Sequence, residues 1–132
     1  MDLPRMTITA IVLDSPNAGE LAGFYERLLG WPRRADEPGW VALRAPGGNI
    51  GLSFQTEDRY VRPRWPAAPG DQQMMTHLDI EVDDLAEAGA HAVAAGATLA
   101  EFQPQEHVRV YLDPAGHPFC LWVVPPDYRP GQ

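Results

Sequence analysis

The sequence contains a single cysteine, Cys120, so no disulfide can form within the chain. This scarcity of cysteine is typical of proteins from a reducing compartment. No apolar run approaches the roughly 20 residues that a helix needs to span a bilayer. The first nine residues also lack an apolar core behind a basic start. We therefore expect a cytoplasmic protein without a signal peptide or a membrane span.

Basic residues are also scarce. Ten Lys and Arg residues stand against 18 Asp and Glu residues, which gives a formal net charge of −8 and a pI near 4.8. Such a field repels nucleic acids and anionic lipids, so we expect neither as a partner. The length of 132 residues fits one domain, and the 45% of hydrophobic residues is ordinary for a globular protein.

The chain repeats a helix-start motif at an offset of 67 positions. Asn17 is followed three residues later by Glu20, and Asp84 is followed in the same way by Glu87. Each pair is typical of a helix N-cap with an acidic residue in the first turn. The patterns predict helices at about 18–29 and 85–95, ended by Gly30 and Gly96 respectively.

Strand patterns accompany both predicted helices, with Gly/Pro turns inside two hairpins. We predict an α+β fold in which two βαβββ modules in tandem form a curved mixed sheet around a central cleft. The single domain, 1–132, would comprise module one at about 6–55, a linker at about 56–73, module two at about 74–124 and a flexible tail at 125–132. The predicted strands lie at 11–14, 33–36, 40–43 and 50–55, and at 78–82, 98–102, 108–112 and 119–123.

Strand alternation predicts which side chains line the cleft, because successive residues point to opposite faces. We expect the apolar set of each strand to pack on a helix and the polar and aromatic set to face the cleft. A pocket with apolar walls and a few converging polar groups would bind a small molecule; one ordinary solvated sheet face is the alternative. Together with two linker aromatics, the predicted ligand-binding residues are Gln55, Tyr60, Trp65, His77, Asp79, Arg109, Tyr111 and Trp122.

The linker is rich in proline, which fixes the backbone and removes amide donors. Pro63, Pro66 and Pro69 lie among the aromatic residues Tyr60 and Trp65. The linker is interpreted either as a strap that covers the edge of the core or as a lid over the cleft.

Three sequence segments resemble the vicinal oxygen chelate superfamily. The first runs from Leu21-Ala22-Gly23-Phe24-Tyr25 to Leu28-Leu29-Gly30-Trp31, the second from His77-Leu78-Asp79 to Leu85, and the third is Asp113-Pro114-Ala115-Gly116-His117 with the strand that follows. With the linker, they are similar to the glyoxalase-like and bleomycin-resistance subgroup of actinobacterial type. The resemblance covers about residues 6–124. It implies the fold firmly, whereas one scaffold in this superfamily carries lyases, transferases, dioxygenases and binding proteins.

The resemblance also implies positions for a divalent metal on the first and last strands of each module. In module one these positions fall at Ala10 and Gly51, which cannot ligate a metal; in module two they fall at His77 and Cys120. The remaining set of His77, Cys120 and Gln55 is small for a metal site. We therefore predict no metal or other cofactor, with those three residues as ligands if a metal is present.

The expected function is small-molecule binding by a glyoxalase/bleomycin-resistance-like protein without the family metal. The alternative is a lyase, isomerase or related enzyme of the glyoxalase type, with His77 as the catalytic acid or base. Cys120 as a nucleophile with His77 as its base is a weaker option. A third interpretation is an accessory domain without a ligand of its own. The resemblance also implies that the protein forms a homodimer.

Overall fold

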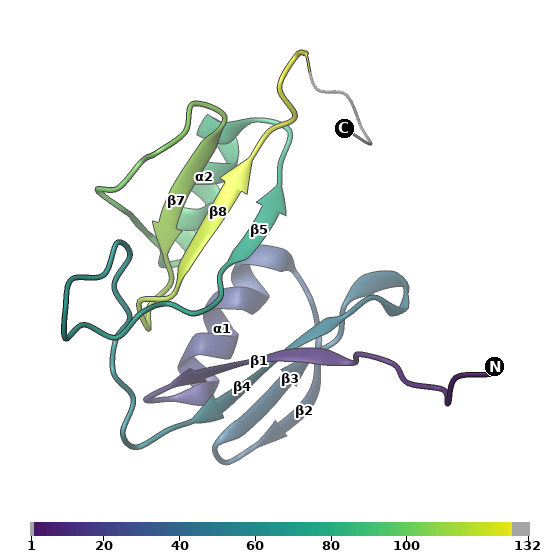
Figure 1. Cartoon of the computed structure of the whole chain (residues 1–132). Helices are drawn as coiled ribbons and strands as arrows, with labels where there is room; N and C mark the ends of the chain where they lie inside the picture. Colours follow the sequence, from purple (N-terminus) through teal and green to yellow (C-terminus); the bar gives the residue numbers. More distant parts are fainter. Residues whose placement is uncertain (1, 128–132) are drawn as a thin grey trace. The chain divides into compact units, whose positions relative to one another are not determined.

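A computed structural model describes residues 2–127, which divide after Tyr60 into two compact units (Figure 1). The first unit contains module one. The second contains most of the linker together with module two. No helix among the described residues combines the length and the apolar character needed to cross a membrane. The predicted tail, 125–132, lies outside the described residues from residue 128 onward.

The first unit is a four-stranded mixed sheet with one helix. Its sheet has the strand order β1-β4-β3-β2, in which β1 and β4 are parallel and the other neighbours are antiparallel. A short 3₁₀ turn, η1, connects β3 and β4. The elements are β1 (Ala10–Ser15), α1 (Ala18–Leu29), β2 (Arg33–Glu37), β3 (Trp40–Leu43), η1 (Pro46–Gly48) and β4 (Gly51–Thr56).

The second unit repeats this topology. Its sheet has the order β5-β8-β7-β6, with β5 and β8 parallel. The predicted α+β fold of two βαβββ modules is therefore confirmed, as two four-stranded sheets; the predicted central cleft stays a prediction. β6 is shorter than the expected 98–102. The elements are β5 (Leu78–Glu81), α2 (Leu85–Ala95), β6 (Thr98–Leu99), β7 (Val108–Leu112) and β8 (Pro118–Trp122).

Both helices begin and end where the sequence motifs place them. The Asn17 side chain accepts a hydrogen bond from the Glu20 amide at 3.1 Å, and Asp84 accepts from the Glu87 amide at 2.9 Å. These bonds satisfy amides that have no partner within the helix. At the end of α1, Gly30 has φ +72°, a left-handed conformation that glycine adopts without steric cost.

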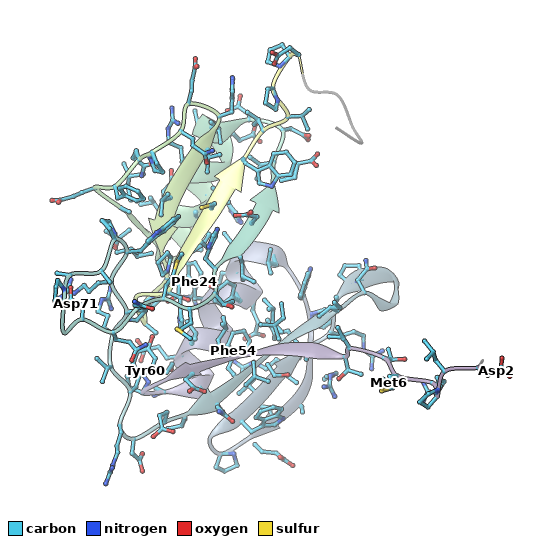
Figure 2. All side chains as sticks on the ribbon, in the orientation of Figure 1. Asp2, Met6, Phe24, Phe54, Tyr60 and Asp71 are labelled. Carbon is cyan, nitrogen blue, oxygen red and sulfur yellow. The ribbon has the colours of Figure 1, made fainter. Side chains whose placement is uncertain are left out.

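The two helices pack on their sheets through different kinds of side chains. In the first unit, buried Leu21 and Tyr25 of α1 face β3 and β4, and the Tyr25 ring stacks on Phe54 with a centroid separation of 5.5 Å. Figure 2 shows Phe54 among the side chains of that unit. In the second unit, α2 is rich in alanine, and Tyr111 of β7 approaches Gly89 so closely that a Cβ atom there would collide with the Tyr111 hydroxyl group.

The linker packs on the hairpin between β7 and β8. Arg62 lies over Gly116, and its guanidinium donates to the Pro114 carbonyl oxygen at 3.2 Å. Within the hairpin, the buried Asp113 carboxylate accepts hydrogen bonds from the amides of Ala115 and His117. His117 Nδ1 lies 2.8 Å from Asp113 Oδ2. This network explains how His117 stabilises the turn before β8.

Candidate functional site

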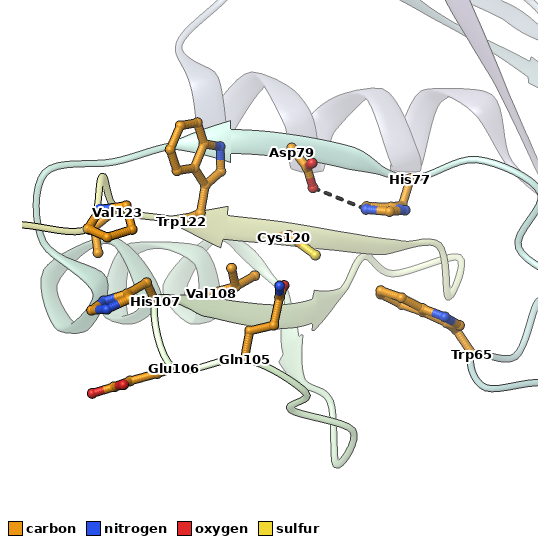
Figure 3. A pocket seen from close by; sticks show the side chains of 11 residues that line it. Trp65, His77, Asp79, Gln105, Glu106, His107, Val108, Cys120, Trp122 and Val123 are labelled. Carbon is orange, nitrogen blue, oxygen red and sulfur yellow. Dashed lines mark ion pairs between the residues drawn. The ribbon is translucent and has the colours of Figure 1, made fainter. Parts of the chain in front are cut away.

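A pocket of about 480 Å³ lies in the second unit, on the face of its sheet that points away from α2 (Figure 3). The strands β5, β7 and β8 supply its floor, and Trp65 of the linker supplies one wall. The loop before β7 and the segment after β8 complete the rim. The lining residues are Trp65, His77, Asp79, Gln105, Glu106, His107, Val108, Cys120, Trp122, Val123 and Pro125.

Strand register explains why these side chains share one face. Asp79 of β5 pairs with Cys120 of β8, which in turn pairs with Val110 of β7. Val108 and Trp122 are paired two residues further along. Paired residues on neighbouring strands point to the same side of a sheet. Along β8, the lining residues Cys120 and Trp122 therefore alternate with Phe119 and Leu121, which are buried on the other face.

His77 and Asp79 form the polar centre of the pocket. His77 Nε2 lies 3.1 Å from Asp79 Oδ1, and the imidazole stacks on the Trp65 ring at 5.0 Å with an interplanar angle of 24°. The His77 side chain is 28% exposed and the Asp79 side chain is 63% exposed. The histidine is thus held between an aromatic face and a carboxylate, while the carboxylate remains accessible from the cavity.

Cys120 lies on the pocket floor beside Asp79. Burial raises the pKa of its thiol to about 11, and the negative charge and hydrogen bonding of Asp79 contribute in the same direction. The group is therefore a neutral thiol at physiological pH. A neutral, buried thiol is a poor nucleophile, so the pairing of Cys120 as nucleophile with His77 as base is not supported.

The three groups form a donor set that a metal ion would fit. The ligand atoms of His77, Asp79 and Cys120 all lie within 4.8 Å of one another, and they offer one nitrogen, one oxygen and one sulfur. Three protein ligands with one open position are typical of catalytic zinc sites. Asp79 is a donor that the sequence interpretation did not include among the metal ligands. Gln55 belongs to the first unit, and its role as a ligand stays a prediction.

Module one lacks the equivalent donors. In the first unit, the β1–β4 register pairs Val12 with Ser53. In the second, the β5–β8 register pairs Asp79 with Cys120. Val12 lies 67 positions before Asp79, and Ser53 lies 67 positions before Cys120, so these residues are equivalent in the two modules. The equivalent of Cys120 is therefore Ser53, and the expected position Gly51 is wrong. Val12 and Ala10 offer no ligand atom, which leaves only the buried Ser53 hydroxyl.

Two predicted site residues lie on the wrong face for this pocket. Arg109 pairs with Leu121 and Tyr111 with Phe119, so both belong to the α2 side of the sheet. The prediction was wrong because it placed the valines of β7 against the helix. The small residues of α2 leave room there for a large ring, and buried Tyr111 fills it, stacking on Phe119 at 5.9 Å.

Arg109 instead holds the loop that forms the pocket rim. Its guanidinium donates to the carbonyl oxygens of Glu106 and Val108 at 2.8 Å, and to that of Gln105 at 3.5 Å. The other predicted residues divide between the units. His77, Asp79, Trp65 and Trp122 meet in the pocket, whereas Gln55 and Tyr60 belong to the first unit, where Gln55 donates to Asp14 at 2.7 Å.

The sequence interpretation missed the rim residues Gln105, Glu106 and His107. His107 reaches the pocket because the Val123 amide donates to its carbonyl oxygen at 3.1 Å, which continues the β7–β8 pairing beyond the strands. No local sequence pattern reports such a pairing. The nearest signal is the run of polar residues directly before β7.

Comparison with known proteins agrees with this architecture. Curated proteins give no match to the chain. The solved structure of a glyoxalase/bleomycin resistance protein/dioxygenase family enzyme from Burkholderia phytofirmans is similar with a TM-score of 0.68 at 18% identity, covering 91% of this chain and 100% of that chain.

Two further solved structures resemble the chain to a similar degree. A glyoxalase-related enzyme from Fulvimarina pelagi has a TM-score of 0.64 at 18% identity, covering 90% of this chain and 88% of its own. A glyoxalase/bleomycin resistance protein from Albidiferax ferrireducens has a TM-score of 0.61 at 17% identity, covering 89% and 98%. At these identities the likeness concerns the fold. The model of the glyoxalase-like domain matches residues 10–122, almost the whole of both modules, and the chain therefore belongs to the glyoxalase-like domain family.

Proposed function

We propose that the protein binds a small organic molecule in the pocket of its second unit. The observation that carries this proposal is the placement of Trp65 and Trp122 around the polar centre of His77, Asp79 and Cys120 (Figure 3). A volume of about 480 Å³ lies within the range of small-molecule sites, and aromatic walls with a few polar groups are their usual lining. Binding by stacking and hydrogen bonding requires no metal.

The first experiment is native mass spectrometry of freshly purified protein, which detects a retained organic ligand and any bound metal in the same spectrum. The second is calorimetric titration with 1-naphthylmethanol, an uncharged flat probe. We expect Trp65→Ala and Trp122→Ala to weaken the probe at least tenfold. Trp31→Phe and Trp40→Phe are matched controls, because both tryptophans belong to the first unit and do not line this pocket.

Absence of both a retained ligand and probe binding would reject small-molecule binding at this site. Equal losses in the pocket variants and in the Trp31 and Trp40 controls would also reject it, because the effect would then be general. Circular dichroism of each variant shows whether the fold is retained.

A second candidate function is metal-assisted enzyme chemistry, favoured by the convergence of His77, Asp79 and Cys120. A bound divalent ion would polarise a carbonyl oxygen of a substrate as a Lewis acid. These three side chains would hold the ion, and the tryptophans would orient the substrate. Without a metal, the enzyme alternative depends on His77 as an acid or base whose ring Asp79 and Trp65 keep in place.

Isothermal titration with zinc decides whether the donor set holds a metal. We expect a stoichiometric site in the protein as purified and a loss of affinity of at least tenfold in His77→Ala and in Cys120→Ser. His91→Ala is the control, since His91 is exposed and lies outside the donor set. Weak binding that all three variants share would remove this second candidate and leave the binding proposal intact.

A further inference from the structure

We propose that the pocket of the second unit selects organic cations, in particular flat aromatic molecules that carry a protonated amine. The proposal rests on the proposed small-molecule binding, because it specifies the chemistry of the ligand in that same pocket. Three features of the lining support it: the sign of its charges, the accessibility of one carboxylate and the placement of two indole rings.

The permanently charged side chains that line the pocket have one sign, and the two histidines His77 and His107 are the other titratable groups of the lining. Asp79 and Glu106 contribute carboxylates, and neither lysine nor arginine occurs among the described residues of the lining. The nearest arginine along β7, Arg109, lies on the opposite sheet face, and its Nη1 donates to backbone carbonyl oxygens. Arg64 lines a separate hollow with Met74 and Met75. An anionic ligand would thus meet two carboxylates and no permanently cationic side chain, whereas a cation would be attracted.

The Asp79 carboxylate can accept a ligand while it keeps its present contacts. His77 approaches Oδ1 at 3.1 Å, yet 63% of the side chain is exposed. An ionised carboxylate offers about four lone-pair sites. A protonated amine could therefore donate to Asp79 beside His77.

The indole rings supply the second half of the recognition. Trp65 closes one end of the pocket, and Trp122 lies at the other side of Asp79 and Cys120 (Figure 3). Indole is the aromatic side chain with the strongest attraction for a cation over its face, and it also stacks on a flat ligand. The combination of indole walls and an open carboxylate favours a molecule that has an aromatic plane and a positive charge together.

The experiment compares three probes that share a naphthalene ring and differ in charge: 1-naphthylmethylamine, 1-naphthylmethanol and 1-naphthaleneacetate. Each is titrated calorimetrically into the full chain at about pH 7.5, with EDTA present so that no metal contributes. We expect the amine to bind about tenfold more tightly than the alcohol, and the acetate to bind most weakly. In Asp79→Asn the preference for the amine should fall to about threefold or less, while the affinity for the alcohol stays within about twofold.

Glu101→Gln is the matched control for net charge. Glu101 is exposed, belongs to the second unit and does not line the pocket. It should retain the preference for the amine.

The outcomes separate this inference from the function on which it rests. Tight binding of the alcohol or the acetate at or above the level of the amine overturns the cation preference and leaves small-molecule binding standing. An equal loss of preference in Asp79→Asn and Glu101→Gln also overturns it, because the selectivity would then come from net charge. Failure of all three probes to bind overturns the cation preference, and it also rejects small-molecule binding when native mass spectrometry detects no retained ligand.

Discussion

Single residues decide the electrostatic character of the pocket. Asp79 contacts His77 and also influences the Cys120 thiol, so one carboxylate links the three polar groups. A buried thiol beside a carboxylate resists ionisation because its thiolate would be both poorly solvated and close to a like charge. The floor of the pocket is therefore uncharged at the position of Cys120 and negative at Asp79.

The raised pKa of Cys120 predicts slow alkylation at neutral pH in metal-free protein. Because the thiolate reacts and the thiol does not, the rate with iodoacetamide should increase up to about pH 11 and should not level off near pH 9. Asp79→Asn removes the nearby negative charge, so the midpoint should move to lower pH. The rate is measured by mass spectrometry of the intact protein, and an alkylation profile centred near pH 9 in the original chain would contradict the argument.

The same pKa has a consequence for stability. The pKa of Cys120 in the folded state lies above the value of 9.0 for a free thiol. The contribution of the protonated thiol to the free energy of unfolding is therefore complete below pH 9 and is lost as the pH rises toward about 11. Cys120→Ser should therefore lose less stability than the original chain between those two pH values. Urea unfolding followed by circular dichroism measures the difference.

At the scale of elements, the two helices show how side-chain size divides a sheet into two faces. α1 contributes large residues and meets Phe54, whereas α2 contributes small ones and leaves space for Tyr111. Large rings thus come from both helix and strand in the first unit, and from the strands in the second. Val108 of β7, on the opposite face, is then available to line the pocket.

Gly89→Ala should destabilise the protein, although alanine is the better helix former. The added Cβ would collide with the hydroxyl group of buried Tyr111, and overpacking of this kind typically costs about 1–3 kcal/mol. Gly19→Ala in α1 is the control, since its nearest neighbour, Asn17 Oδ1, would lie at an ordinary 3.6 Å. Urea denaturation of both variants measures the effect, and equal stability of the two would mean that Tyr111 does not pack on α2 as described.

At the scale of the whole molecule, the net charge of −8 gives a long-range field of the same sign as the pocket carboxylates. This field attracts cations toward the protein and is screened by salt, with a Debye length of about 10 Å at 0.1 M. Local and global charge therefore act in the same direction on a cationic ligand.

Salt should weaken the binding of 1-naphthylmethylamine by several-fold between about 20 mM and about 500 mM sodium chloride, while 1-naphthylmethanol changes little. Calorimetry at each salt concentration measures both affinities. Part of the effect should persist in Glu101→Gln, because that substitution leaves Asp79 in place. A parallel loss for the neutral alcohol would show that the salt acts on the protein and not on the charge of the ligand.

The features predicted correctly from the sequence are those that depend on interactions between residues close together in the chain. The caps at Asn17 and Asp84 lie within three residues of the amides that they bind, and so both helices were predicted with their correct bounds. The repeat at 67 positions established the two βαβββ modules for the same reason, since each copy carries its own local signals. β6 was predicted too long because its pairing with β7 depends on where the following loop departs.

The sequence by itself determined the module repeat, the helix ends and the alternation that places His77 and Asp79 on one strand face. Only the tertiary structure decided which face of β7 meets α2, because Val108 and Tyr111 are both apolar enough for a core and the outcome depends on the space beside Gly89. It also decided that Trp65 stacks on His77 and that Asp79 joins Cys120. Contacts between residues distant in the chain depend on register and packing, and no local spacing encodes them.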